Sequence, residues 1–407
     1  MISVTKAKSL VLKNSFTFGV VKLPLEKASG LTLAEDILAL NDVPSFTNSA
    51  MDGYAVKSKL TQGATKDNPV ALKLIASVKA GSFAKQILKN GETIKIMTGA
   101  PLPKGSDSVI IKENTVEENG KILIKKNVRL GENVRFQGEE IKKGDLALRK
   151  FTTLNPAALG FLAAIGAKLV KVFKPPVITV VVTGDEVVTS SKKLAFGKIH
   201  DSNSVSLKAA LKECGIDKVN ILKNPDDVLC LQKNLSKAIR IADMVLISGG
   251  ISVGDYDYVR KILKSLKVKE IFWKVAQKPG KPLYFGKKDP ALVFGIPGNP
   301  AACLVVFYEY IRPAILKGMG RENVSLPSVK VKLTSTVKKN QYTTYFWRGQ
   351  LNTNGTQPKA TVSEKQGSHM LKSFALGDCL IIGPANLTRI KKDSLVEVHI
   401  LPWRNSL

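Results

Sequence analysis

The sequence has few cysteines and few histidines, and neither kind is clustered. The cysteines include no CxxC pair, so neither a zinc knuckle nor a disulfide framework is supported, and buried free thiols are the favoured alternative. The histidines are equally scattered, which argues against a histidine-based metal site. The residues concerned are Cys214, Cys230, Cys303, Cys379, His200, His369 and His399.

Long apolar runs are also missing. Hydrophobic residues make up 44% of the 407 residues, yet no uninterrupted apolar run reaches the roughly 18 residues of a membrane-spanning helix. This pattern is typical of a soluble globular protein, and the length suffices for about two to four domains. The first eight residues lack the apolar core of a secretory signal, so we expect a cytoplasmic protein with no membrane partner.

Aromatic residues are scarce, at 6% of the chain, although the net charge is +29. A strongly basic surface attracts polyanions, but 52 of the 62 basic residues are lysine and no run of five forms a basic arm. No aromatic pattern suited to stacking bases is present either. A lysine-rich solvated surface is favoured over nucleic-acid binding, and we expect no nucleic-acid partner.

The chain changes its pattern along its length, which predicts several domains. A segment to about residue 47 has helical apolar spacing, and residues 48–140 carry short β-type runs. Helical spacing returns over 154–167, before the break at Lys174-Pro175-Pro176. The expected β-runs of this half are 71–78, 92–97 and 121–128.

Apolar strands alternate with helices after the diproline. This alternation predicts a parallel α/β sheet with right-handed crossovers, with strands at 177–182, 243–248 and 291–296 and helices at 202–214 and 301–316. From about residue 324 short β-segments return, and they predict a compact C-terminal β-domain. Those segments are 329–333, 343–351, 379–382 and 395–401.

Glycine-rich loops follow each of the three predicted parallel strands. Ligands bind beyond the carboxyl ends of strands in such sheets, so we expect the loops to converge on one crevice. The loops are Thr183–Glu186, Ser248–Gly254 and Pro297–Pro300.

Lysines and acids surround the same predicted crevice. Lys278-Pro279-Gly280-Lys281-Pro282 is a stiff cationic loop suited to an oxyanion, and Lys274 lies just before it; ordinary surface lysine is the alternative. Carboxylates near phosphate-binding glycines are typical of a magnesium site. Helix capping is the alternative for the acids, sufficient for Asp201 and Asp226, whereas both roles stay open for Glu186 and Asp257. The acids are Asp185, Glu186, Asp201, Asp226, Asp227, Asp255 and Asp257.

Six motifs in one order carry a resemblance. They resemble those of the molybdopterin molybdenumtransferase family, which includes MoeA and the gephyrin E domain. The motifs span most of the chain, and Gln366-Gly367-Ser368-His369 adds a match in the last domain. The six are Asn48–Ala55, Ile96–Pro101, Thr183–Glu186, Ser248–Gly254, Lys278–Pro282 and Pro297–Pro300.

The resemblance implies a multidomain fold of the α/β plus β class. Its parts would be a central three-layer parallel α/β molybdopterin-binding domain, a β-rich inserted domain, a C-terminal β-barrel-like domain and a discontinuous N-terminal linker and dimerisation domain. The expected boundaries are 174–323 for the α/β domain, 48–140 for the inserted β-domain and 324–407 for the C-terminal domain. The linker and dimerisation domain would comprise 1–47 and 141–173.

The resemblance also implies an activity. The family inserts molybdenum from molybdate into adenylylated molybdopterin, with Mg²⁺ assisting and AMP released. A homodimer with a shared active site and contact with molybdopterin adenylyltransferase are the implied partners. The alternatives are a molybdopterin adenylyltransferase and a non-enzymatic scaffold. The flanking β-domains favour the molybdenum-inserting enzyme over the adenylyltransferase, and no extra partner domain supports a scaffold.

Carried over residue by residue, the resemblance assigns candidate roles. Glu186 and Asp257 would position magnesium, while Lys278, Lys281, Ser368 and Arg348 would hold molybdate. Asp52 and Thr98 lie before the diproline, so the partner subunit would supply them. Many relatives carry Val-Ser where this chain has Ala301-Ala302, so one hydroxyl is missing. The catalytic candidates are Asp52, Thr98, Glu186, Asp226, Asp257, Lys274, Lys278 and Lys281; the binding candidates are Gly184, Asp185, Ser248, Gly249, Gly250, Ser252, Gly254, Pro297, Gly298, Asn299, Pro300, Arg348 and Ser368.

Overall fold

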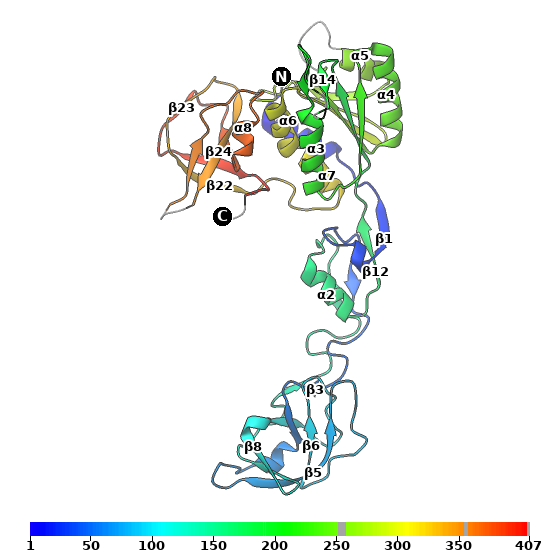
Figure 1. Ribbon diagram of the computed structural model, residues 1–407, viewed down its shortest axis with the longest axis vertical. Helices are drawn as coiled ribbons and strands as arrows, with labels where there is room; N and C mark the ends of the chain where they lie inside the picture. Colours follow the sequence, from blue (N-terminus) through cyan, green and yellow to red (C-terminus); the bar gives the residue numbers. More distant parts are fainter. Residues whose placement is uncertain (190, 192, 251–257, 354–356, 405–407) are drawn as a thin grey trace. The chain divides into compact units, whose positions relative to one another are not determined.

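The computed structural model describes residues 1–189, 191, 193–250, 258–353 and 357–404 (Figure 1). The chain divides into two compact units, each described separately. The first comprises Met1–Val21, Gly30–Ala34 and Lys171–Leu407, and the second comprises Lys22–Ser29 and Glu35–Val170. The four-domain division is finer than this, and stays a prediction.

A six-stranded sheet forms the centre of the first unit. Its order is β16-β13-β17-β21-β20-β18, and the first four strands are parallel as predicted. β20 pairs antiparallel with β21, because a short hairpin joins them, and β18 pairs antiparallel with β20. The sequence patterns did not reveal these antiparallel pairings. The bounds are β13 Ile178–Thr183, β16 Val219–Asn224, β17 Met244–Ser248, β18 Lys269–Trp273, β20 Tyr284–Lys288 and β21 Ala291–Ile296.

Helices cover both faces of this sheet, which gives three layers. Alternate residues of β17 point to opposite faces: Leu246 joins the apolar core beneath α3 and α6, and Val245 joins the core beneath α4 and α5. Figure 1 shows these helix pairs on opposite sides of the sheet. The bounds are α1 Val4–Asn14, α3 Ser202–Glu213, α4 Val228–Ile241, α5 Tyr258–Ser265, α6 Pro300–Val306 and α7 Arg312–Gly318.

Two helical predictions need correction. The helix expected over 301–316 is interrupted by a π-helical turn, Phe307–Ile311, between α6 and α7. Helical spacing in the first 47 residues corresponds to α1 alone; short strands and a 3₁₀ turn follow it. Apolar residues in such short segments do not distinguish a helix from half-buried strands by spacing alone.

The C-terminal part of the first unit is a closed β-barrel. The order β24-β25-β22-β28-β26 closes because β26 also pairs with β24, and β19 adds to β24 in parallel. Closure leaves no free edge among these five strands. The bounds are β19 Gln277–Lys278, β22 Ser328–Leu333, β24 Thr344–Asn352, β25 Lys359–Val362, β26 Cys379–Gly383 and β28 Leu395–Ile400; smaller elements are β14 Val187–Val188, β15 Ile199–His200, β23 Val337–Lys338, β27 Arg389–Ile390 and α8 Lys372–Ala375.

The second unit is built on a six-stranded sheet in the order β7-β4-β6-β5-β9-β8. Both faces of β4 are buried, since Tyr54 and Ala55 point into two different apolar clusters. The β-rich character expected for 48–140 is therefore present. The bounds are β4 Gly53–Val56, β5 Val70–Val78, β6 Glu92–Ile96, β7 Ser108–Ile111, β8 Thr115–Glu118 and β9 Lys121–Ile124; the remaining elements of the chain are β1 Val20–Pro24, β2 Ile37–Leu38, β3 Asn48–Ser49, β10 Val134–Arg135, β11 Leu146–Leu148, α2 Pro156–Ala164, β12 Leu169–Phe173 and the 3₁₀ turns Leu25–Lys27, Ser58–Thr61 and Lys112–Asn114.

The described part of the chain contains no helix long and apolar enough to cross a membrane. All four cysteines are free. The interpretation as buried free thiols is confirmed for Cys214, Cys303 and Cys379, whereas Cys230 is only partly buried. Burial raises the pKa of the Cys303 thiol to about 12, so this thiol is inert at neutral pH.

Candidate active site

The loops after β13, β17 and β21 meet in one cavity of about 590 Å³, as predicted. These three strands are neighbours in the sheet, so their carboxyl ends lie side by side. We call this space the strand-end cavity. Its lining residues are Val182, Thr183, Glu186, Val187, Ile199, His200, Asp201, Ser202, Asn203, Ser248, Gly249, Gly250, Pro282, Pro297, Gly298, Asn299, Pro300 and His369.

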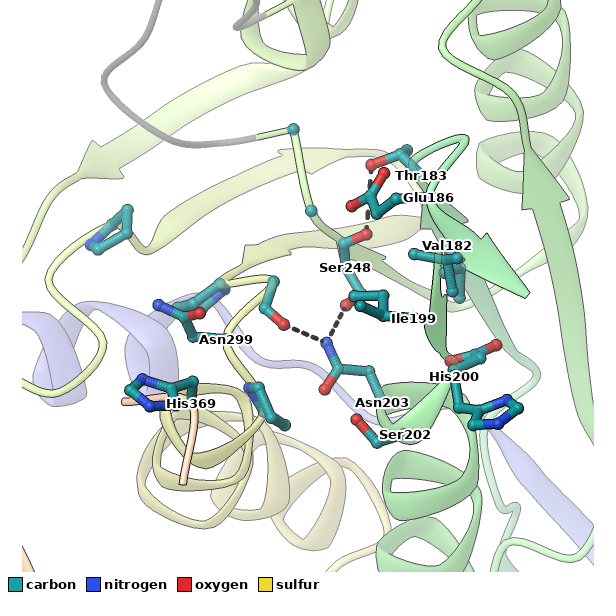
Figure 2. A pocket seen from close by; sticks show the side chains of 18 residues that line it. Val182, Thr183, Glu186, Ile199, His200, Ser202, Asn203, Ser248, Asn299 and His369 are labelled. Carbon is teal, nitrogen blue, oxygen red and sulfur yellow. Dashed lines mark hydrogen bonds between the residues drawn. The ribbon is translucent and has the colours of Figure 1, made fainter. Parts of the chain in front are cut away.

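Asn203, in the first turn of α3, joins two of the loops. Its Nδ2 donates to Ser248 Oγ at 2.8 Å and to the Gly298 carbonyl oxygen at 2.8 Å (Figure 2). Ser248 Oγ therefore accepts from Asn203, so its own proton is available for an acceptor in the cavity. Asn203 thus sets the polarity of the hydroxyl on the cavity floor.

Glu186 is the carboxylate of the loop after β13 that reaches the cavity. Its side chain folds over Gly184, where a Cβ would stand 2.5 Å from Glu186 Oε2. Gly184 also has a φ of +123°, so both space and conformation favour glycine there. Magnesium takes one or two carboxylates together with water and phosphate oxygens, and the Glu186 carboxylate fits that requirement.

No group of three or more potential metal ligands occurs in the described part of the chain. With the Glu186 carboxylate as one ligand, a magnesium ion would also take water and oxygens of a substrate. Asp257, Ser252 and Gly254 lie outside the described residues.

The other acids of these loops have structural tasks. Asp201 caps α3 by accepting from Ser204 N at 3.0 Å, as expected, and the cap of α4 is Asp227 rather than Asp226. Asp226 N instead donates to Asp185 Oδ1 at 3.2 Å. Neither Asp185, Asp226 nor Gly184 lines the strand-end cavity.

A second cavity of about 770 Å³ adjoins the first and shares Pro282, Pro297, Asn299 and His369 with it. We call it the lysine cavity, because Lys278 and Lys281 line it. The loop Lys278–Pro282 forms one wall, and residues of the barrel form another. The lining residues are Gln277, Lys278, Pro279, Gly280, Lys281, Pro282, Pro297, Asn299, Ala302, Asn340, Thr343, Tyr345, Phe346, Trp347, Arg348, Gln366, Gly367, Ser368 and His369.

Arg348, on β24, adds a buried positive charge to this wall. It is 1% exposed, its Nε donates to Ser373 Oγ at 3.0 Å, and one terminal nitrogen donates to the Gly367 carbonyl oxygen at 2.9 Å. Burial lowers the pKa of the guanidinium to about 10, so it remains charged at neutral pH. Both partners are neutral, so among the described residues no ion pair offsets the charge of Arg348, which suits an anion.

Ser368 connects the two cavities through its neighbours. Its Oγ accepts from Asn299 Nδ2 at 2.9 Å, and its carbonyl oxygen accepts from Ala301 N at 3.0 Å and Ala302 N at 3.2 Å. The first amides of α6 are thus satisfied by protein. Ala302 contributes a methyl group, and no hydroxyl, to the lining of the lysine cavity.

Comparisons with known proteins cover the chain. Residues 2–166, 179–317 and 330–401 match the models for the MoeA N-terminal region (domain I and II), a probable molybdopterin binding domain and the MoeA C-terminal region (domain IV). The molybdopterin molybdenumtransferase of Staphylococcus epidermidis is 34% identical, covering 100% of this chain and 96% of its own length; that of Staphylococcus aureus is 32% identical, covering 98% and 95%. The chain belongs to the molybdopterin molybdenumtransferase family.

Solved structures agree with this family. Two structures of MoeA proteins from Pyrococcus horikoshii have TM-scores of 0.84 and 0.82 and sequence identities of 33% and 29%. Each covers 98% of this chain, and 99% and 100% of its own. The match extends over both β-rich parts as well as the α/β part, so the predicted family and multidomain fold are confirmed, and the adenylyltransferase and scaffold alternatives are not favoured.

Three further family-derived candidates, besides Gly184, Asp185 and Asp226, lie outside both cavities. Lys274 packs its Nζ 3.7 Å from the centroid of the Trp273 ring, and it lines neither cavity, contrary to our expectation. Asp52 and Thr98 belong to the second unit, where Thr98 N and Oγ1 donate to Asp52 Oδ1 at 2.8 and 2.7 Å. These two bonds lower the pKa of Asp52, so it is ionised at neutral pH.

Some lining residues were not predicted from the sequence. Asn203 and Gln277 lack a charge or a glycine-rich context, and His369 entered only within a family motif. The position of Asn203 at the start of the helix predicted over 202–214 was an available signal. Gln277 offered no comparable signal, because its partners are set by the fold.

Proposed function

We propose that this chain inserts molybdenum from molybdate into adenylylated molybdopterin and releases AMP. One observation carries the proposal: two adjoining cavities carry opposite kinds of charge. Lys278, Lys281 and Arg348 line the lysine cavity, whereas Glu186 and the glycine-rich loops line the strand-end cavity. A tetrahedral dianion suits the first, and a pterin nucleotide with a magnesium-bound pyrophosphate suits the second.

The lysine cavity would hold the oxyanion. The Lys278 and Lys281 ammonium groups are exposed and supply point charges, and Arg348 supplies a fixed fork that two neutral partners orient. Ser368 Oγ accepts from Asn299, so its proton is available for an oxygen of molybdate. These groups bind and orient the substrate before reaction.

The strand-end cavity would hold the pterin nucleotide. Ser248 Oγ presents a donor from its floor, and the Gly249 and Gly250 loop permits a close approach of a phosphate oxygen. Glu186, together with Asp257, would hold Mg²⁺. The chemistry that a bound Mg²⁺ would supply there is stabilisation of negative charge on the pyrophosphate.

We also propose a homodimer in which the partner subunit completes the site with its Asp52 and Thr98. The support is their pairing with each other on a unit apart from the cavities, at positions that match family motifs. Contact with a molybdopterin adenylyltransferase would deliver the adenylylated substrate. A cytoplasmic location agrees with such a role in cofactor synthesis.

The test is a reconstituted reaction. Purified protein, adenylylated molybdopterin and Mg²⁺ are mixed with and without molybdate, and AMP release is measured over time. We expect release that requires molybdate. Release at the same rate without molybdate would contradict the insertion reaction.

A further inference from the structure

A buried amide holds the lysine loop from the inside. Gln277 is 2% exposed, and its Nε2 donates to the carbonyl oxygens of Pro279 at 3.2 Å and Gly280 at 3.1 Å. Tyr310, on the π-helical turn, donates its hydroxyl proton to Gln277 Oε1. The opposite amide orientation would set an oxygen against two carbonyl oxygens, so this network fixes the side chain.

The two captured carbonyls determine where the loop amides point. In a trans peptide the C=O and N–H groups point in opposite directions, so the Gly280 and Lys281 N–H groups face away from the Gln277 amide. Neither N–H donates to another backbone or side-chain group in the described part of the chain. Both residues line the lysine cavity.

Gly280 permits this close packing. Its φ is +88°, and a Cβ there would lie 2.7 Å from Gln277 Nε2 and 3.0 Å from Val306 Cγ2. A side chain would therefore push the loop off the amide. Gly280 and Gln277 therefore act together to keep the loop against the buried amide.

We propose that Gln277 is a positioning residue for the oxyanion site. A carbonyl oxygen carries partial negative charge, so a carbonyl facing molybdate would oppose its binding. By holding two carbonyls inward, Gln277 leaves successive amide N–H groups to bind the oxyanion beside the Lys278 and Lys281 ammonium groups. This inference rests on the proposed function, which assigns molybdate to the lysine cavity.

The experiment varies molybdate in the AMP-release reaction. Gln277→Leu removes the donors at similar volume, and Tyr310→Phe removes only the bond that orients them. We expect the half-saturating molybdate concentration to rise about tenfold for Gln277→Leu and about threefold for Tyr310→Phe. The KM for adenylylated molybdopterin should stay within about twofold, since that substrate occupies the strand-end cavity.

A double-variant cycle and a matched control complete the design. Gln277→Leu combined with Lys281→Ala should raise the half-saturating molybdate concentration by less than the product of the two single fold-changes, because both residues act through one loop. Gln232→Leu, on the exposed face of α4, should leave both KM values unchanged. Thermal midpoints of all variants are measured in parallel.

The outcomes separate this inference from the proposed function. If the unaltered protein releases AMP without molybdate, the proposed function fails, and the positioning role with it. If release depends on molybdate but both variants keep the original half-saturating concentration, the positioning role alone is overturned. An equal rise in both KM values, with a lower thermal midpoint, would show general damage and also overturn it.

Discussion

The two adjoining cavities differ in the charge of the groups that line them. Among the described residues, the strand-end cavity is lined by the carboxylates Glu186 and Asp201 and by neither lysine nor arginine. The described lining of the lysine cavity includes Lys278, Lys281 and Arg348 and no carboxylate. Their shared wall is made of Pro282, Pro297, Asn299 and His369. In the proposed reaction, this separation would let one site hold a metal-assisted nucleotide and an oxyanion without mutual neutralisation of the protein groups.

The cavities also differ in how they are built. Three adjacent parallel strands of one sheet place the glycine-rich loops of the strand-end cavity, so the position of these loops follows from local topology. The lysine cavity needs the barrel, since Arg348 and Ser368 come from residues far along the chain. We therefore expect changes to barrel packing to act on molybdate more than on the nucleotide.

Lys281→Ala should have the largest effect. Removing a point charge from the lysine cavity should lower molybdate-dependent AMP release roughly 100-fold, without loss of folding. Steady-state rates at several molybdate concentrations measure this effect, and Lys288→Ala, at the exposed end of β20, is the matched control. Wild-type turnover in Lys281→Ala would remove this lysine from the site.

Glu186→Gln should affect the other cavity. The neutral isostere keeps the shape of the side chain but holds magnesium less well, so the half-maximal Mg²⁺ concentration should rise about tenfold. The molybdate dependence should stay unchanged. A Mg²⁺ titration of AMP release tests this, with Glu322→Gln on the exposed loop after α7 as control. An unchanged Mg²⁺ curve would contradict the role of Glu186.

Asn203→Asp should have a smaller effect, and it tests whether the two cavities bind their substrates separately. A carboxylate would accept the Ser248 hydroxyl proton, which reverses that contact, and would face the Gly298 carbonyl oxygen, which makes that contact repulsive. We expect the KM for adenylylated molybdopterin to rise about fivefold and that for molybdate to stay constant. Equal rises in both would mean that the cavities do not act separately.

His399→Gln should have the smallest effect, and on stability rather than turnover. Glu309, 3% exposed on the π-helical turn, accepts from Lys8 of α1 and from His399 Nδ1 of β28 at 2.7 Å. Burial raises the pKa of Glu309, but the bonds from His399 and Lys8 outweigh it, so the pKa lies below its usual 4.5. Burial likewise opposes charging of His399, yet its bond to Glu309 raises its pKa above 6.5.

These shifts fix the sign of the pH dependence. The His399 contribution is fully present below pH 6.5 and is lost as the pH rises through the raised pKa. The Glu309 contribution is present above pH 4.5 and is lost as the pH falls through the lowered pKa. Urea unfolding should therefore show His399→Gln destabilised by about 1–2 kcal/mol near pH 6, and by less at pH 9. A difference that grows toward pH 9 would contradict this account.

The strand-end cavity was largely predictable from the sequence. Apolar runs followed by glycine-rich loops predicted parallel strands whose loops converge on one crevice, and the structure confirms that the loops meet in one cavity. The Asp226 and Asp227 pair shows the limit of such patterns. Which of two adjacent acids caps α4 depends on the residue at which the helix begins, and the sequence pattern does not locate that residue to within one position.

The lysine cavity was predictable only in part. Lys278 and Lys281 were predicted from their proline-rich loop, but Gln277 contacts Tyr310 across 33 residues, on a π-helical turn that apolar spacing does not reveal. Lys274 was expected at the cavity on its closeness in sequence to the loop. Its positive φ of 68° and its contact with Trp273 direct it elsewhere.

The pairing of β19 with β24 makes the barrel a structural support of the lysine loop. Gln277 and Lys278 lie opposite Thr344 and Tyr345 in parallel register, so the loop begins as a strand of the barrel sheet although its sequence lies within the α/β region. An excised α/β domain would keep every residue of the loop but would lose the sheet edge to which it is anchored. Transplanting the oxyanion site to another protein would accordingly require the barrel as well.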